Sequence, residues 1–311
     1  MATRSLSNIP RAAILRAADS PWLRRIVDRY GMRLGAARFV AGETLDECVP
    51  VLRRLNEAGL RANTTLLGED IRAADDAAAV VVEYERILDR LAAEELRVNL
   101  AVKLTHLGLA FEEGAAYANV ERIVAHAGGL GMFVRIDMEQ SRFVEPTLRI
   151  YERLRDAGHR NVGVVLQAYL HRAPSDLERL LPRTPNLRIV KGAYLEPPSI
   201  AHPAKSAVDR AYVQLVERAL QGGAFVAVAT HDERIIRRVQ SFVRREGIAL
   251  DRFQFQMLYG VRPALQRRLA AEGYDVLVAT PFGPEWYPYL MRRLAERPAN
   301  ILFFLRNLLR R

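Results

Sequence analysis

Residues 187–231 read LRIVKGAYLEPPSIAHPAKSAVDRAYVQLVERALQGGAFVAVATH and hold one complete repeat of the pattern that decides the fold. Two short apolar runs, 187–193 and 224–231, enclose a segment at 206–220 whose apolar residues recur at helical spacing. Two short runs joined by a helix of this length are typical of parallel strands with a crossover helix. The stretch therefore predicts a strand–helix–strand unit.

The same alternation continues on both sides of this unit. Eight apolar runs occur in all, at 61–67, 96–104, 132–138, 162–168, 187–193, 224–231, 252–258 and 274–280. Segments with helical periodicity lie between them, at 73–93, 117–127, 145–157, 206–220, 233–246 and 263–272, whereas the connection after residue 168 is short and bounded by prolines. Eight repeats predict an α/β fold of the TIM-like (β/α)8 barrel type, with a doubly wound open sheet as the alternative.

The N-terminal part of the chain lacks this alternation. Leu45, Val49, Leu52 and Leu55 fall at helical spacing, and glycines interrupt the segment before them. We therefore expect a helical arm over residues 1–58 and a catalytic barrel over residues 59–311.

The overall composition narrows the possible classes of protein. One cysteine, Cys48, among 311 residues excludes an intramolecular disulfide and indicates a reducing compartment. The chain has no apolar run of about 18 residues and no signal-peptide pattern, so we expect a cytoplasmic protein, with peripheral contact at the inner face of the cell membrane as an alternative. The net charge of +10 is spread as arginine over many helices, and nucleic acid is not an expected partner.

Neither a dinucleotide fingerprint nor a metal-binding motif is present. Gly128, Gly129 and Gly131 follow a helix and precede a strand, which is the wrong order for a turn that binds pyrophosphate. The six histidines include no HExxH pair, and there is no cysteine cluster, so no metal site is expected.

Polar residues lie in or directly after six consecutive strands, toward the ends where a barrel carries its active site. These positions include Lys103, Thr105 and His106; Asp137, Met138 and Glu139; Gln167; Arg188 and Lys191; Thr230 and His231; and Gln254 and Gln256. Each one alone has a structural explanation, such as an ion pair between Lys103 and Asp137 or a satisfied amide in the core. Six such strands at one rim indicate a cationic site for an anionic ligand.

The segment PFGPEWYPYLMRRLAERPAN at 281–300 predicts a turn at 281–284 followed by a helix that Pro298 ends. Arg292 and Arg293 point about 100° apart on this helix, so they can approach one small anion from two sides. Glu296 is placed to pair with either arginine. A carboxylate clamp is one interpretation, and a basic surface helix with an ordinary ion pair is the other.

Seven segments in order resemble the proline dehydrogenase family. They are VKLTHLGL (102–109), RIDMEQS (135–141), LQAYL (166–170), LRIVKGAY (187–194), ATHD (229–232), FQMLYG (255–260) and WYPYLMRRLAERPAN (286–300). The chain is similar to the monofunctional bacterial form, because it has no room for an aldehyde dehydrogenase domain. The resemblance implies a distorted barrel whose eighth helix covers the mouth, and it implies FAD bound non-covalently without a Rossmann domain. It also implies oxidation of L-proline to Δ1-pyrroline-5-carboxylate, transfer of electrons to a membrane quinone, and transient contact with pyrroline-5-carboxylate dehydrogenase.

The resemblance also implies roles for residues at matching positions of this sequence. Lys103, Asp137 and Arg188 would act at the reacting centre, although it stays open whether Lys103 or Asp137 moves protons. The expected substrate-binding residues are Lys103, Leu258, Ala279, Tyr289, Arg292, Arg293 and Glu296. The expected FAD-binding residues are Met138, Gln167, Arg188, Lys191, Gly192, Ala193, Thr230 and His231.

Three positions depart from the family's usual pattern. Leu277 stands where an arginine is usual, Ala279 where a tyrosine is usual, and Gln254 where a glutamate is usual. The space left by Ala279 suggests 4-hydroxyproline or another substituted cyclic imino acid as an alternative substrate. Two other classes stay open: a Schiff-base barrel that uses Lys103 or Lys191, and an inactive membrane-associated scaffold that uses the basic, apolar tail at 301–311.

Overall fold

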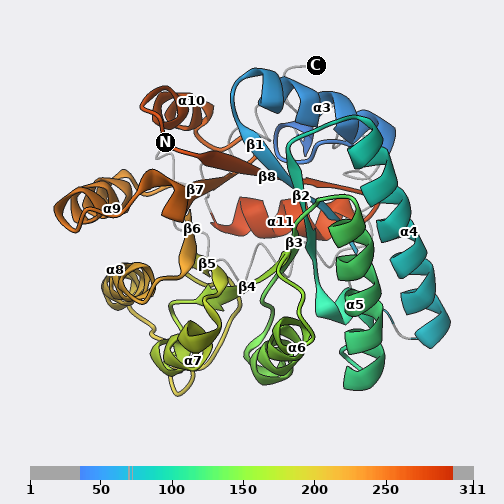
Figure 1. The fold of residues 1–311 in the computed structure, drawn as a ribbon, viewed down its shortest axis with the longest axis horizontal. Helices are drawn as coiled ribbons and strands as arrows, with labels where there is room; N and C mark the ends of the chain where they lie inside the picture. The colour runs from blue at the N-terminus through green and yellow to red at the C-terminus, as the bar shows by residue number, and fades with distance from the viewer. Residues whose placement is uncertain (1–35, 69–70, 72, 297–311) are drawn as a thin grey trace, which may run out of the picture.

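The computed structural model describes residues 36–68, 71 and 73–296, and the side chains of Arg292, 294, 295 and Glu296 are not described. Eight parallel strands form a closed barrel in chain order (Figure 1). They are β1 (Arg61–Leu66), β2 (Val98–Val102), β3 (Val134–Ile136), β4 (Val162–Gln167), β5 (Asn186–Val190), β6 (Phe225–Ala229), β7 (Phe253–Leu258) and β8 (Val276–Phe282). The predicted barrel is confirmed and the open sheet is excluded, because β1 pairs with β8 over six residues.

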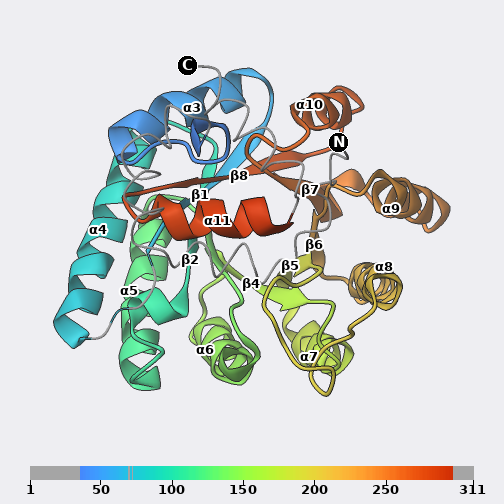
Figure 2. The ribbon, with the colours of Figure 1, turned by 180° about the vertical axis from the view of Figure 1, so that it is seen from behind.

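A helix follows every strand. Outside the barrel lie α4 (Ala74–Ala93), α5 (Glu113–Gly129), α6 (Val144–Asp156), α7 (Ala173–Leu180), α8 (Lys205–Gln221), α9 (Glu233–Arg245) and α10 (Pro263–Ala271). The last helix, α11 (Trp286–Glu296), lies instead across the opening of the ring of strands, as Figure 2 shows. The expectation of an eighth helix over the barrel mouth is therefore confirmed.

Two local predictions were wrong. The connection after residue 168 contains α7, which begins beside Pro174; proline is tolerated in the first turn of a helix because its missing N–H has no partner there anyway. The predicted turn at 281–284 starts later, because Pro281 and Phe282 still belong to β8 and pair with Thr65 and Leu66.

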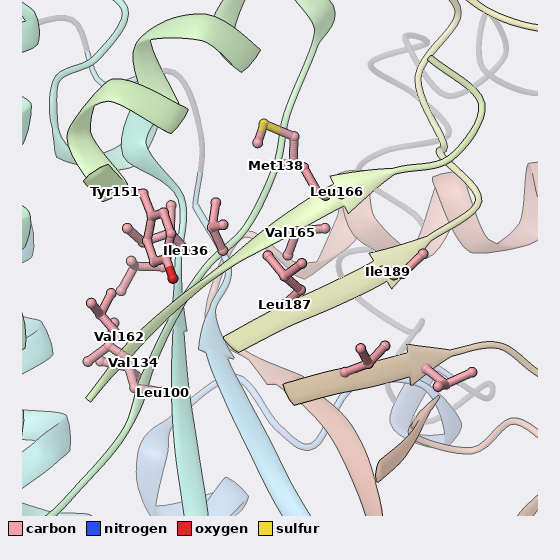
Figure 3. Packing of buried hydrophobic residues seen from close by; sticks show 14 of the residues in the cluster. Leu100, Val134, Ile136, Met138, Tyr151, Val162, Val165, Leu166, Leu187 and Ile189 are labelled. Atoms are coloured by element: carbon pink, nitrogen blue, oxygen red, sulfur yellow. The ribbon is translucent and has the colours of Figure 1, made fainter. Parts of the chain in front are cut away.

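The core lies between the strands and the outer helices. Leu100, Val134, Ile136 and Val162 point outward from neighbouring strands and belong to one buried cluster with Tyr151 of α6 (Figure 3). Because strand side chains alternate, the positions between these residues face the interior of the barrel. That interior is unusually polar: it holds Asn63, Arg135, Gln167, Arg188, Gln254 and Gln256, all of which are buried.

The helix before the barrel, α3 (Leu45–Glu57), shares this core. Leu45, Val49 and Leu52 belong to the same buried cluster as the barrel residues. Cys48 lies with its sulfur 3.7 Å from Oγ1 of Thr64, and burial raises the pKa of its thiol to about 12. Residues 1–35 and the tail at 301–311 lie outside the described residues, so the division into an arm and a barrel stays a prediction.

Ion pairs link successive helices around the outside of the barrel. The pairs are Arg90–Asp46, Arg122–Glu85, Arg149–Glu113, Arg179–Glu152, Arg218–Glu178, Arg238–Glu217 and Arg268–Glu233, and together they connect α3 to α10. Each exposed pair contributes little by itself. The series nevertheless shows that many arginines serve contacts between helices.

In the described part of the chain, no helix has the length and apolar character needed to cross a membrane.

Candidate active site

The centre of the site is Arg188, which extends from β5 into the barrel and is 8% exposed. Its Nη1 donates to Oδ1 of Asp137 at 2.7 Å, its Nε to Oε1 of Gln256 at 2.6 Å, and its Nη2 to Oδ1 of Asn63 at 2.8 Å. These three acceptors come from the β3 end, β7 and β1. Burial lowers the pKa of the Arg188 guanidinium, and the Asp137 carboxylate opposes that shift. The barrel thus holds one positive charge in a fixed orientation.

A second buried arginine lies beside it in the barrel. Arg135 of β3 donates through Nη1 to the carbonyl oxygens of Val164, at 3.1 Å, and Asn186, at 2.7 Å, and through Nη2 to Oδ1 of Asn186. Burial, and after it the charge of Arg188, lowers the pKa of Arg135 to about 9. Gly163 on β4 makes room for this guanidinium, because a Cβ there would lie 2.3 Å from Nη1.

The segment after β2 brings Lys103 to the rim, half-buried. His106 follows in a short 3-10 helix (Leu104–Leu107), where burial, and then the charge of Lys103, lowers the pKa of its imidazole to about 4. The buried carboxylate of Glu139 accepts hydrogen bonds from the backbone N of Thr105 at 3.1 Å and from its Oγ1 at 2.5 Å. Glu139 therefore holds the segment that carries Lys103, and His106 is neutral near pH 7.

Lys191, after β5, is engaged by carboxylates. Its Nζ lies 2.5 Å from Oδ1 of Asp209 and 3.5 Å from Oδ2 of Asp232, and Lys205 also pairs with Asp209. The chain has three lysines in all, Lys103, Lys191 and Lys205. Schiff-base formation requires a free amine as nucleophile. The paired state of Lys191 therefore counts against the interpretation as a lysine barrel that uses this residue.

Gly192 is required by the conformation of the chain after β5. Its φ is +110°, and a Cβ there would lie 2.1 Å from the ring of Tyr169. Ala193 continues the loop from this glycine.

Gln167, at the end of β4, is only partly satisfied. Its Nε2 donates to the carbonyl oxygen of Glu139 at 2.7 Å. The Oε1 of Gln167 is buried and has no hydrogen-bond partner among the residues that the structure describes.

For the FAD that the family resemblance implies, we expect Gly192→Ala to weaken binding at least tenfold, because the methyl group and the strained φ would both displace the loop from Tyr169. Equilibrium titration of flavin-free protein with FAD measures this loss. Gly273→Ala is a matched control, since its φ is also positive, at +87°, but no atom lies within 4 Å of the added Cβ. Equal affinities of the two variants would show that contact with Tyr169 is unimportant.

Residues after β6 connect that strand to β7. Oγ1 of Thr230 accepts from the backbone N of Asp232 at 3.1 Å, and Asp232 caps α9 by accepting from the N of Arg234. Nε2 of His231 accepts from the backbone N of Leu258 at 2.9 Å. The imidazole therefore acts as an acceptor at Nε2 and holds Leu258 at the rim, while Asp232 caps the helix.

The covering helix α11 contributes Tyr289 and Arg293, both half-buried, with the guanidinium carbon 5.3 Å from the Tyr289 ring centre. The side chains of Arg292 and Glu296 lie outside the described residues. The carboxylate clamp therefore stays a prediction.

Two further predicted site residues lie on other elements. Met138 is buried after β3, and Ala279 is half-buried on β8, in register with Leu258.

Asn63 was not predicted from the sequence as a site residue, although it directly contacts Arg188. The only signal was an asparagine at an inward position of the first strand, in the run RANTTLL. The suggested ion pair between Lys103 and Asp137 is replaced by the pair between Arg188 and Asp137.

The sequence profile described as proline dehydrogenase matches residues 48–305, most of the chain. The chain belongs to the proline dehydrogenase family. It is 39% identical to proline dehydrogenase 1 of Bacillus subtilis subsp. natto over 301 residues, covering 97% of this chain and 99% of that one. It is also 38% identical to the proline dehydrogenase of Deinococcus radiodurans over 309 residues, covering 98% and 99% of the two chains.

The fold is shared with larger proteins. A crystal structure of proline utilization A from Bdellovibrio bacteriovorus, inactivated by N-propargylglycine, superimposes with a TM-score of 0.81 at 23% identity. The match covers 88% of this chain and 34% of that one.

Two positions singled out in the sequence, Gln254 and Leu277, lie on neighbouring strands. Gln254 of β7 and Leu277 of β8 both face the interior, and the register places Leu277 beside Gln256.

Proposed function

We propose that this protein oxidises L-proline to Δ1-pyrroline-5-carboxylate with FAD at the barrel mouth and passes the electrons to a membrane quinone. The observation that carries the proposal is Arg188, a buried cation held by three acceptors at the mouth of a barrel of this family. Transient contact with pyrroline-5-carboxylate dehydrogenase, and attachment at the inner face of the cell membrane, belong to the same proposal.

The chemistry of the rim fits a flavin. Gln167 offers a buried acceptor oxygen that no described residue uses, which suits an N–H group of a ligand. Gly192 keeps the loop free of a side chain where the backbone closes on Tyr169. Arg188 and Lys191 supply positive charge, and Met138, Ala193, Thr230 and His231 complete the proposed binding set.

FAD, when bound, would accept the hydride from the carbon next to the proline nitrogen. Arg292 and Arg293 would bind the substrate carboxylate and orient the ring between Leu258 and Tyr289, because positioning supplies much of the rate. The charge of Arg188 would stabilise negative charge that develops on reduction. Asp137 holds Arg188 in place, and Lys103 adds positive charge at the rim, so their proposed roles are electrostatic and positional.

The test is an absorbance spectrum of the purified protein before and after anaerobic addition of L-proline. We expect a yellow protein whose flavin band bleaches on addition of the substrate. A colourless protein that cannot be reconstituted with FAD would refute the proposal and favour the inactive scaffold.

A second candidate is the same chemistry on 4-hydroxyproline or another cyclic imino acid. Ala279 favours it, because this small, half-buried side chain lies in register with Leu258, where the family usually has tyrosine. In the same experiment, bleaching by 4-hydroxyproline but not by L-proline would support this candidate.

A further inference from the structure

A chain of hydrogen bonds runs from Arg188 through the barrel interior to its opposite end. Nε of Arg188 donates to Oε1 of Gln256 at 2.6 Å, and Nε2 of Gln256 donates to Oε1 of Gln254 at 2.5 Å. Nε2 of Gln254 donates to Oδ2 of Asp275 at 2.8 Å, and Nη1 of Arg61 lies 3.6 Å from the same oxygen. The two glutamines are buried, whereas the side chains of Asp275 and Arg61 are 31% and 43% exposed.

The direction of this chain is set by its two ends. A guanidinium can only donate hydrogen bonds, and a carboxylate can only accept them. Gln256 must therefore turn its oxygen toward Arg188, and Gln254 must turn its nitrogen toward Asp275. Only one orientation of each amide satisfies both neighbours, so the ends determine the orientation of the middle.

This arrangement makes the two amides depend on each other. If Gln254 lost its oxygen, the buried Nε2 of Gln256 would lose its acceptor in this series of hydrogen bonds, and a buried donor without a partner is costly. Rotation of the Gln256 amide to find another partner would remove the acceptor from Nε of Arg188. Gln254 thus affects Arg188 although the hydrogen-bond chain separates them by one residue.

We propose that Gln256 and Gln254 are positioning residues that fix the orientation of the Arg188 guanidinium, and that Asp275 anchors them from the far end of the barrel. The effect on catalysis rests on the proposed function. The effect on Arg188 itself does not, because the hydrogen bonds lie wholly within the protein.

The first experiment measures hydrogen exchange of the Arg188 Nε–H by NMR in the purified protein, with the signal assigned by its loss in Arg188→Lys. We expect Gln254→Met to speed this exchange at least tenfold. Gln240→Met is the matched control, since Gln240 lies on α9 and bonds only Glu272 of the structure's described residues, at 3.3 Å. Equal exchange rates in Gln254→Met and the unaltered protein would overturn the proposal.

A second pair of variants tests the chain without removing polar groups. Gln254→Glu keeps an acceptor for Nε2 of Gln256 but places a second carboxylate opposite that of Asp275, and neither group can donate to the other. Repulsion between the two charges should displace the new side chain from Gln256, so we expect faster exchange at Arg188. Adding Asp275→Asn supplies a donor again, so the double variant should return the exchange rate to within about twofold of the unaltered protein. A double variant no better than Gln254→Glu alone would count against the anchoring role of Asp275.

The third readout is the midpoint potential of bound flavin. Gln254→Met should weaken binding of reduced relative to oxidised flavin about tenfold, which lowers the potential of a two-electron couple by about 30 mV. We also expect kcat to fall more than KM for proline rises. If Arg188 exchange changes but the flavin potential does not, Gln254 has only a structural role and the proposed effect on catalysis is wrong. If the protein binds no flavin, the proposed function is refuted, whereas the exchange result still tests the orientation of Arg188.

Discussion

Arg188→Met is expected to slow reduction of bound flavin by L-proline by about 100- to 1000-fold, which is the usual loss when one preorganised electrostatic group is removed. The substitution deletes the positive charge and leaves Asp137, Gln256 and Asn63 without the donor they share. Anaerobic stopped-flow absorbance measures the effect on the reductive step directly.

Two further variants separate the effect of the charge from the effect of its geometry and from a general effect of removing an arginine. Arg188→Lys keeps a positive charge but cannot reach three acceptors in the same geometry, so we expect an intermediate rate. Arg238→Met removes an arginine whose side chain is 63% exposed and pairs with Glu217 on the outer surface, and it should leave the rate unchanged. A rate for Arg188→Met within about fivefold of the unaltered protein would contradict the proposed role.

Gly163→Ala is expected to lower the free energy of unfolding by about 3 kcal/mol, since it both overpacks the interior and displaces a buried cation. The added Cβ would lie 2.3 Å from Nη1 of Arg135 and 2.5 Å from the carbonyl oxygen of Asn186. Arg135 is 2% exposed and has little space to move. Urea unfolding followed by circular dichroism measures the change.

Gly129→Ala is the control, because it makes the same substitution in α5 with no atom within 4 Å of the new Cβ. Alanine is the better helix former, so this variant should be as stable as the unaltered protein or slightly more stable. The combination of Gly163→Ala with Arg135→Met should recover part of the loss. A loss below about 1 kcal/mol for Gly163→Ala would show that the barrel relaxes around Arg135.

Much of the fold could be read from local pattern. The eight strands lie within the predicted apolar runs or within two residues of them, because the alternation of apolar runs and helical segments is a property of short windows. The missed helix α7 spans only eight residues and has Pro174 in its first turn, so it had a weak periodic signal. The end of β8 was missed because Pro281 and Gly283 resemble a turn, although pairing with β1 extends the strand.

The site was predictable only in part. The sequence placed Arg188 in the fifth strand and Asp137 and Lys103 at strand ends. It offered a pair between Asp137 and Lys103 as one explanation, whereas the structure pairs Asp137 with Arg188. Strand position predicts the rim on which a side chain lies. It does not predict which side chains meet across the barrel.

The sequence by itself determined the barrel, most of its helices and the group of polar residues at one rim, since periodicity and strand order arise from neighbouring residues. Only the tertiary structure showed that Asn63 and Arg188, 125 positions apart, share a hydrogen bond, and that Asp275 anchors a chain of amides leading to it. These contacts depend on closure of β1 against β8 and on the register of every strand between them. Register is a collective property of the closed barrel, and no short stretch of sequence contains it.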